Sequence, residues 1–266
     1  MIHALLLAAA AILVPEASSP QNDYNLSEAG RTRVFARSEA EFRNARIMVS
    51  ERSRAGWSEP RQIAFSDPRW SDSDPWLTPD GRTLYFISDR PAPGRAEGAR
   101  DYDIWRAVRT ATGAWSAPER LGPEVNSAGQ ELGPELHGTT LYFSSARRSG
   151  LGGLDIYAAP AAGTGFARAA LLDGPFNGAA SDSDFTLSPD GRTALFWRSG
   201  EGGTGLLHIA RRTAGGPWSE PAPLPAAINR GPFNFTPSFS RDGRTITYAS
   251  TGADGLADIY RARLPT

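Results

Sequence analysis

The chain has 266 residues and a formal net charge of −1, and all 28 of its basic residues are arginine. Because 29 acidic residues balance them, no net field would attract a polyanion, and we expect no nucleic-acid partner. Hydrophobic residues make up 40% of the chain, which together with the low net charge predicts a folded protein. Cysteine is absent, so disulfides, thiolate nucleophiles and cysteine-ligated zinc are excluded.

An apolar run covers Ala4 to Val14 and is followed by Pro15 and by small residues at 17–19. The run is shorter than the roughly 20 residues that span a bilayer, but it matches the apolar region of a secretory signal. We therefore expect a signal peptide at residues 1–20, export to a bacterial periplasm and no membrane span. A buried first strand is the alternative interpretation of the same run.

A motif of the type Pro-Asp-Gly-Arg-Thr recurs along the chain, and a fixed period of this kind predicts a repeat protein. Its glycines occupy positions 30, 81, 138, 191 and 243, at spacings of 51, 57, 53 and 52 residues. Five repeats of about 50 residues follow, which we assign to residues 21–67, 68–122, 123–172, 173–225 and 226–266.

A full repeat contains signals for four strands. A run of consecutive apolar residues follows the glycine, as in Leu84–Ile87, and predicts a strand covered on both faces. A third strand begins at Asp-Ile-Trp or Asp-Ile-Tyr, and a fourth begins at Trp-Ser-x-Pro, where the proline requires an edge position. The pattern predicts an all-β propeller of four-stranded blades, with five blades expected and six, one of them degenerate, as the alternative. Since the fifth repeat ends after its third strand, the stretch before Asp23 is the expected donor of the fourth.

The segment from Asn126 to Tyr157 includes Leu-Tyr-Phe-Ser-Ser at 141–145 and Gly-Gly-Leu-Asp-Ile-Tyr at 152–157. With the recurring Pro-Asp-Gly turn, it resembles the TolB-like family of β-propellers, whose repeats are of the WD40 type. The resemblance covers residues 21–263. It implies an exported scaffold that binds a protein, a peptide or a cell-wall component without covalent chemistry. We expect such a scaffold to be a monomer.

A polar residue precedes or begins the innermost strand of each repeat, and these strands surround the channel of a propeller. We expect a ligand site at one mouth of the channel, formed by Asp72, Asp74, Glu131, Asp182, Asp184 and Asn234, with Gln21 as the first-repeat counterpart and Trp70 and Arg69 in an adjoining loop. Any metal would be Ca²⁺ held by the oxygens of Asp72, Glu131 and Asp182, and no other cofactor is expected. The alternative interpretation is structural: each acid caps backbone N–H groups or pairs with an arginine.

A glycoside hydrolase of the five-bladed type is the alternative function. Two carboxylates at the channel mouth would then act as general acid and base, and Trp70 and Trp76 would stack on sugar rings. The sequence contains no Gly-x-Ser-x-Gly, which excludes the nucleophile elbow of an esterase or peptidase. The loop at 88–100, rich in Gly, Pro and Arg, is the longest expected blade-end loop and a candidate part of the binding surface.

Overall fold

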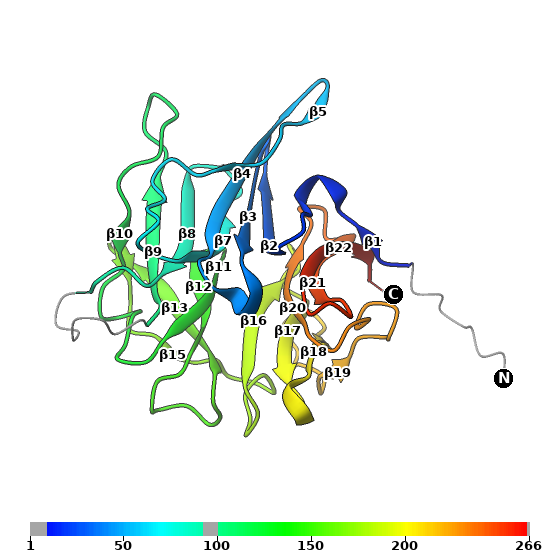
Figure 1. Cartoon of the computed structure of the whole chain (residues 1–266). Coiled ribbons are helices and arrows are strands. Elements are labelled where there is room, and N and C mark those ends of the chain that lie inside the picture. Colours follow the sequence, from blue (N-terminus) through cyan, green and yellow to red (C-terminus); the bar gives the residue numbers. More distant parts are fainter. Residues whose placement is uncertain (1–9, 93–100, 265–266) are drawn as a thin grey trace.

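The strands of the computed structural model form five antiparallel sheets arranged in a ring (Figure 1). The structure describes residues 10–92 and 101–264. Each sheet is one blade of four strands, which confirms the all-β propeller and the count of five blades rather than six.

The blades follow the chain, with the innermost strand first in each. Blade 1 contains β2 (Asn22–Ala29), β3 (Thr32–Ser38), β4 (Arg46–Ser53) and an outer strand in two parts, β5 (Gly56–Trp57) and β6 (Arg61–Gln62). Blade 2 contains β7 (Asp72–Leu77), β8 (Thr83–Ser88), β9 (Asp103–Val108) and β10 (Glu119–Arg120). Blade 3 contains β11 (Glu131–His137), β12 (Thr140–Ser145), β13 (Asp155–Ala162) and the two-part outer strand β14 (Gly165–Phe166) and β15 (Ala170–Leu171). Blade 4 contains β16 (Asp182–Leu187), β17 (Thr193–Ser199), β18 (Gly205–Arg211) and β19 (Ala222–Pro223). Blade 5 contains β20 (Asn234–Phe239), β21 (Thr245–Thr251), β22 (Ala257–Arg263) and, as its outer strand, β1 (Ile12–Leu13).

The repeated Pro-Asp-Gly turn joins the first and second strands of a blade. In blade 2, Asp80 accepts hydrogen bonds from the hydroxyl of Thr78 (2.6 Å) and the backbone N–H of Arg82 (3.0 Å). Gly81 follows with φ +70°, a left-handed conformation that favours glycine. The same two bonds recur at Asp190 and Asp242, so the motif owes its conservation within the chain to turn geometry.

The second strand of each blade is covered on both faces, as its consecutive apolar residues predict. In β8, Leu84 and Phe86 pack into a cluster with Ile47 and Val49 of blade 1. Tyr85 and Ile87, which point the other way, pack with Leu141, Phe143 and other residues of blade 3. Successive blades therefore share their core across each interface.

A recurring asparagine that the motif analysis did not identify joins the third and fourth strands of three blades. Asn126 accepts a hydrogen bond from the N–H of Ile104 (2.7 Å) and donates to the carbonyls of Ile104 (3.0 Å) and Leu121 (2.8 Å). Asn177 and Asn229 make the equivalent three bonds in the next two blades.

The N-terminal segment completes the fifth blade, as expected from the missing strand of the last repeat. Residues Ile12 and Leu13 pair with Arg261 and Tyr260 of β22, and the segment runs beside β22 in Figure 1. Just beyond β1, Val14 is 5% exposed and Ala17 is fully buried. The predicted leader, residues 1–20, therefore includes a strand of the ring, and cleavage at residue 20 would remove that strand. Residues 12–13 do form a strand, as the alternative interpretation predicts, but both side chains are exposed rather than buried.

Within the described residues, no helix has the length and apolar character required to cross a bilayer.

Candidate functional site at the channel mouth

The polar residues at the starts of the innermost strands are fully buried inside their own blades. Alignment by the strand registers places Asp23 in line with Asp72, Glu131, Asp182 and Asn234. The counterpart in the first repeat is thus Asp23 and not Gln21. In this repeat the strand position lies closer to the turn glycine than the spacing suggested.

Four of these residues form ion pairs with an arginine on, or just after, the second strand of the same blade. Arg37 binds Asp23 (Nε–Oδ1 2.7 Å), Arg198 binds Asp182 (Nε–Oδ1 2.5 Å), Arg147 binds Glu131 (Nη2–Oε1 3.3 Å) and Arg90 binds Asp72. Burial nevertheless raises the pKa of Asp182 to about 6, and it raises the pKa of Asp23, Asp72 and Glu131 as well. A buried carboxylate without its partner is costly, so each arginine holds the start of its blade together. This is the arrangement that the structural alternative predicts.

The fifth member, Asn234, makes neutral bonds in place of an ion pair. Its side chain accepts from the hydroxyl of Ser250 (2.8 Å) and donates to the carbonyls of Gly205 (3.1 Å) and Gly231 (2.8 Å). An amide satisfies the same buried position without a cation, which explains why the fifth repeat has no arginine opposite it.

Other predicted site residues lie away from any shared centre. Arg69 is exposed, pairs with Asp67 (2.6 Å) and stacks over Trp70, while Trp76 contacts Tyr85 and faces the opposite mouth of the ring. Asp72, Glu131 and Asp182 occupy separate blades, and the described part of the chain contains no group of three His, Cys, Asp or Glu side chains arranged to hold a metal ion. Of the loop at 88–100, residues 93–100 lie outside the described residues.

Each innermost strand has a β-bulge two residues after its buried polar start residue. The five bulge residues have a left-handed backbone conformation and together form a ring. Each of the five innermost strands shifts register here, and the residue at the shift has a positive φ. These residues are Asn25 (+53°), Asp74 (+47°), Gly133 (+54°), Asp184 (+56°) and Thr236 (+47°). Asp and Asn are among the residues that tolerate this conformation best, whereas threonine is not. The bulges turn the side chains of Asp74 and Asp184 toward the centre of the ring.

Hydrogen bonds at the bulges join every blade to the next. The bulge N–H groups donate as follows: Asn25 to Thr236 Oγ1 (3.2 Å), Gly133 to Asp74 Oδ2 (3.0 Å), Thr236 to Asp184 Oδ2 (3.0 Å) and Asp184 to Ser144 Oγ (3.2 Å). Beside the bulges, the hydroxyls of Tyr24 and Ser73 share a hydrogen bond (2.9 Å) that links the first two blades. The ring is closed by these contacts, so each carboxylate has a fixed position.

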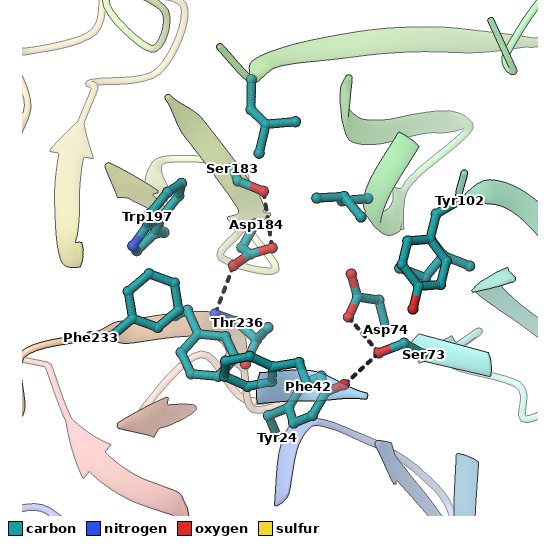
Figure 2. A pocket seen from close by; sticks show the side chains of 14 residues that line it. Tyr24, Phe42, Ser73, Asp74, Tyr102, Ser183, Asp184, Trp197, Phe233 and Thr236 are labelled. Atoms are coloured by element: carbon teal, nitrogen blue, oxygen red, sulfur yellow. Dashed lines mark hydrogen bonds between the residues drawn. The ribbon is translucent and has the colours of Figure 1, made fainter. Parts of the chain in front are cut away.

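A cavity of about 250 Å³ opens at this level, at the mouth where the innermost strands begin. Figure 2 shows Asp74 and Asp184 on opposite sides of it, with aromatic rings along a third side. The aromatic lining consists of Tyr24, Phe42, Tyr102, Trp197, Phe233 and Phe235, with Phe42 and Phe233 supplied by blade-end loops. Of the described residues that line the cavity, none is basic.

Burial disfavours the charged form of both carboxyl groups in the cavity. Burial, and then the negative charge of Asp74, raise the pKa of Asp184 to about 7. Burial also raises the pKa of Asp74, although Gly133 N–H and Ser73 Oγ donate hydrogen bonds to it. Among the described residues, neither has a cationic partner comparable to Arg37 or Arg198. The strand-start acids are thus neutralised internally, while the bulge acids are not.

A second cavity, of about 300 Å³, lies at the opposite mouth near the Pro-Asp-Gly turns. Its lining includes Trp76, His137 and Glu135, and burial raises the pKa of Glu135 to about 8. The Thr186 hydroxyl donates a hydrogen bond to this carboxyl (2.7 Å). The sequence analysis did not identify Glu135, which has no acidic counterpart at the aligned positions Ser27, Trp76, Thr186 and Ser238.

Comparison of the sequence with family models and with curated proteins finds no match. Comparison of the structure finds TolB from Acinetobacter baumannii, with a TM-score of 0.53 and 17% identity over 94% of this chain, which spans 56% of that protein. A protein from Agrobacterium tumefaciens assigned as TolB has a TM-score of 0.55 and 14% identity, with 97% of this chain and 99% of that chain covered.

The α-L-arabinofuranosidase of Podospora anserina, determined in complex with cellotriose, has a TM-score of 0.54 and 10% identity, with 96% of each chain covered. At these identities the likeness describes the fold alone. The chain is thus a five-bladed propeller similar to TolB proteins, as its repeats predict, and it is as similar to a propeller with glycosidase activity.

Proposed function

We propose that this chain is an exported, non-catalytic scaffold of the bacterial envelope that binds a protein, peptide or cell-wall ligand in the cavity between Asp74 and Asp184. The observation that supports this proposal best is the cavity itself. It combines a rigid ring, aromatic walls and two polar groups that converge on one space. Resemblance to the TolB propellers supports the envelope location and the binding role.

The ring of bulges favours binding over catalysis. Asp74 and Asp184 each accept a backbone N–H of the neighbouring blade at 3.0 Å, and equivalent positions in the other blades are Asn, Gly and Thr. Their placement therefore follows from ring geometry that all blades share. A binding site needs only this fixed placement, whereas a hydrolase also needs a carboxyl free to exchange a proton with the substrate.

A glycoside hydrolase is the second candidate, and one observation favours it. Two carboxyl groups face one cavity, and one has its pKa raised to about 7, as a general acid requires. Against this function, the cavity of about 250 Å³ is slightly below the range of about 300–1,000 Å³ usual for small-molecule sites, so it admits one group of a larger ligand rather than several sugar rings.

The proposal is tested by affinity capture from a solubilised envelope fraction, with the full chain as bait. Phe42→Ala removes an aromatic wall of the cavity at a half-buried loop position, and we expect it to abolish capture of the specific partner. Leu151→Ala is the matched control, because Leu151 is 62% exposed and does not line the cavity. Capture by the control and not by Phe42→Ala, with equal melting temperatures, supports the proposal.

Equal capture by both variants, or no partner at all, would contradict it. The hydrolase candidate is examined on the same preparations with arabinan, xylan and chromogenic glycosides. Sugar release that disappears in Asp184→Asn would replace the binding role with the enzymatic one.

A further inference from the structure

We propose that the ligand group that enters the mouth cavity is a monocation, a protonated amine or guanidinium on a short apolar stem. This inference rests on the proposed function and names the chemistry of its ligand. Its basis is the distribution of charge and aromatic surface around one cavity of fixed shape.

The first argument is charge balance. Each strand-start acid has an arginine of its own blade within 3.3 Å, so those charges are satisfied without a ligand. Among the described residues, the hydrogen bonds that Asp74 and Asp184 accept come from neutral donors, including Gly133 N–H, Thr236 N–H and the hydroxyls of Ser73 and Ser183. A cation between them would supply the interaction that the other acids of the ring already have.

The second argument is the shape and composition of the walls. Aromatic faces attract cations through their quadrupoles, and the attraction is stronger in a desolvated site. Phe42, Phe233 and Phe235 contact one another with centroid distances of 4.8 to 6.5 Å and form one continuous aromatic wall. This wall accommodates an apolar stem, while the carboxylates opposite it bind the charged end.

The third argument is the rigidity of the carboxylates. The bulge hydrogen bonds fix the side chains of Asp74 and Asp184 from different blades, and Asp184 Oδ1 lies 2.9 Å from the position that a Cβ on Gly133 would occupy. Glycine at 133 therefore leaves Asp184 room between its neighbours. A preorganised pair of acids binds a cation with little loss of side-chain entropy.

Protons compete with the cation for the same two groups. Among the described residues, the titratable side chains that line the cavity are Asp74, Asp184, Tyr24 and Tyr102. Burial raises the pKa of both tyrosines, which therefore stay neutral. Because the pKa of Asp184 is about 7, a cation that binds below this pH must displace a proton. Affinity should thus fall by up to about tenfold per pH unit below pH 7.

The experiment is an NMR titration of the ¹⁵N-labelled full chain with n-butylammonium, n-butylguanidinium and, as the neutral isostere, butan-1-ol. We expect saturable shifts of the Trp197 indole and of the Gly133 and Thr236 amides with the two cations and none with the alcohol. Asp184→Asn keeps an acceptor for Thr236 N–H and should weaken cation binding at least tenfold. Glu201→Gln, which removes one exposed charge from the same blade, should leave it unchanged.

Two results would overturn the inference: binding of the alcohol as strongly as of the cations, or cation binding that does not change between pH 5 and pH 8. The pH series uses the unmodified chain, so the inference stays testable even if Asp184→Asn does not fold. Where partner capture depends on Phe42 but is equal in Asp184→Asn and the unmodified chain, the scaffold role stands and the cationic ligand is refuted. Where capture depends on neither residue, both proposals fail.

Discussion

Replacement of Val14 by alanine tests whether the N-terminal segment is part of the folded ring. Val14 packs in a cluster with Ala17, Leu26, Phe35 and Ile259, which joins blade 5 to blade 1. Its N–H also donates to the carbonyl of Ile259 (2.9 Å), a bond that the substitution leaves in place. Loss of two buried methyl groups costs about 1.6 kcal/mol in transfer free energy, and the space left behind raises the total to about 2 kcal/mol.

For a chain of this size, 2 kcal/mol corresponds to a fall in melting temperature of about 4–8 °C. Ile12→Ala is the matched control, since Ile12 pairs with β22 but is 70% exposed, and we expect a change within about 0.5 kcal/mol. The assay is urea unfolding and calorimetry of the full chain and both variants. Equal stabilities for Val14→Ala and Ile12→Ala would refute the reasoning.

The same segment makes a prediction that bears on the proposed export. Intact-mass analysis of the mature chain from a periplasmic fraction should locate its N-terminus directly. A mature chain that begins after residue 20 would lack β1. The substitution Val14→Ala in the precursor would then leave the stability of the mature chain unchanged.

Three further predictions follow from buried polar groups and backbone conformation. Glu135→Gln should abolish part of the pH dependence of the free energy of unfolding. The pKa of Glu135 in the fold is about 8 and exceeds its ordinary value of 4.5. This group therefore stabilises the fold most below pH 4.5 and loses that contribution as the pH rises to 8. Urea unfolding from pH 4.5 to pH 9 should therefore show the variant gaining on the unmodified chain by up to about 1.4 kcal/mol per pH unit, and parallel curves would exclude the effect. Gly133→Ala should destabilise the fold by about 1–3 kcal/mol and displace Asp184, whereas Gly163→Ala, also left-handed but with open space at its Cβ, should cost only the smaller backbone part and leave cation binding intact. Asn126→Ala breaks three hydrogen bonds and leaves the N–H of Ile104 in β9 without its partner, so thermal unfolding should register a loss of about 2–4 kcal/mol; a loss below 1 kcal/mol would show that water replaces the amide.

The repeat pattern predicts the architecture because the blade is a local unit. The glycines at 81, 191 and 243 have the left-handed φ that the Pro-Asp-Gly turn requires, and apolar runs such as Leu84–Ile87 face two neighbouring blades as expected. Both features depend on residues close together in the chain. They can therefore be read from one repeat and checked against the next.

The site is harder to predict because it depends on the closed ring. Asp74 and Asp184 were candidates for their acidity, but their difference from Asp72 and Asp182 arises from a register shift of one residue, which the alignment of the repeats by their turns does not reveal. Phe42 and Phe233 belong to loops of different blades and meet only when the first blade packs against the fifth. The repeated asparagines at 126, 177 and 229 did have a signal, a spacing of 51 and 52 residues, that a search for the turn motif alone overlooks.

The position of β1 beside β22 has a consequence for chain connectivity. Because Ile12 lies opposite Arg261 in an antiparallel pair, a short linker between the described ends, near residues 10 and 264, would make an ordinary hairpin. All five blades would then have the same connection from third to fourth strand. The protein should accordingly tolerate circular permutation, with new ends cut between any two blades, because all junctions between blades would then be equivalent.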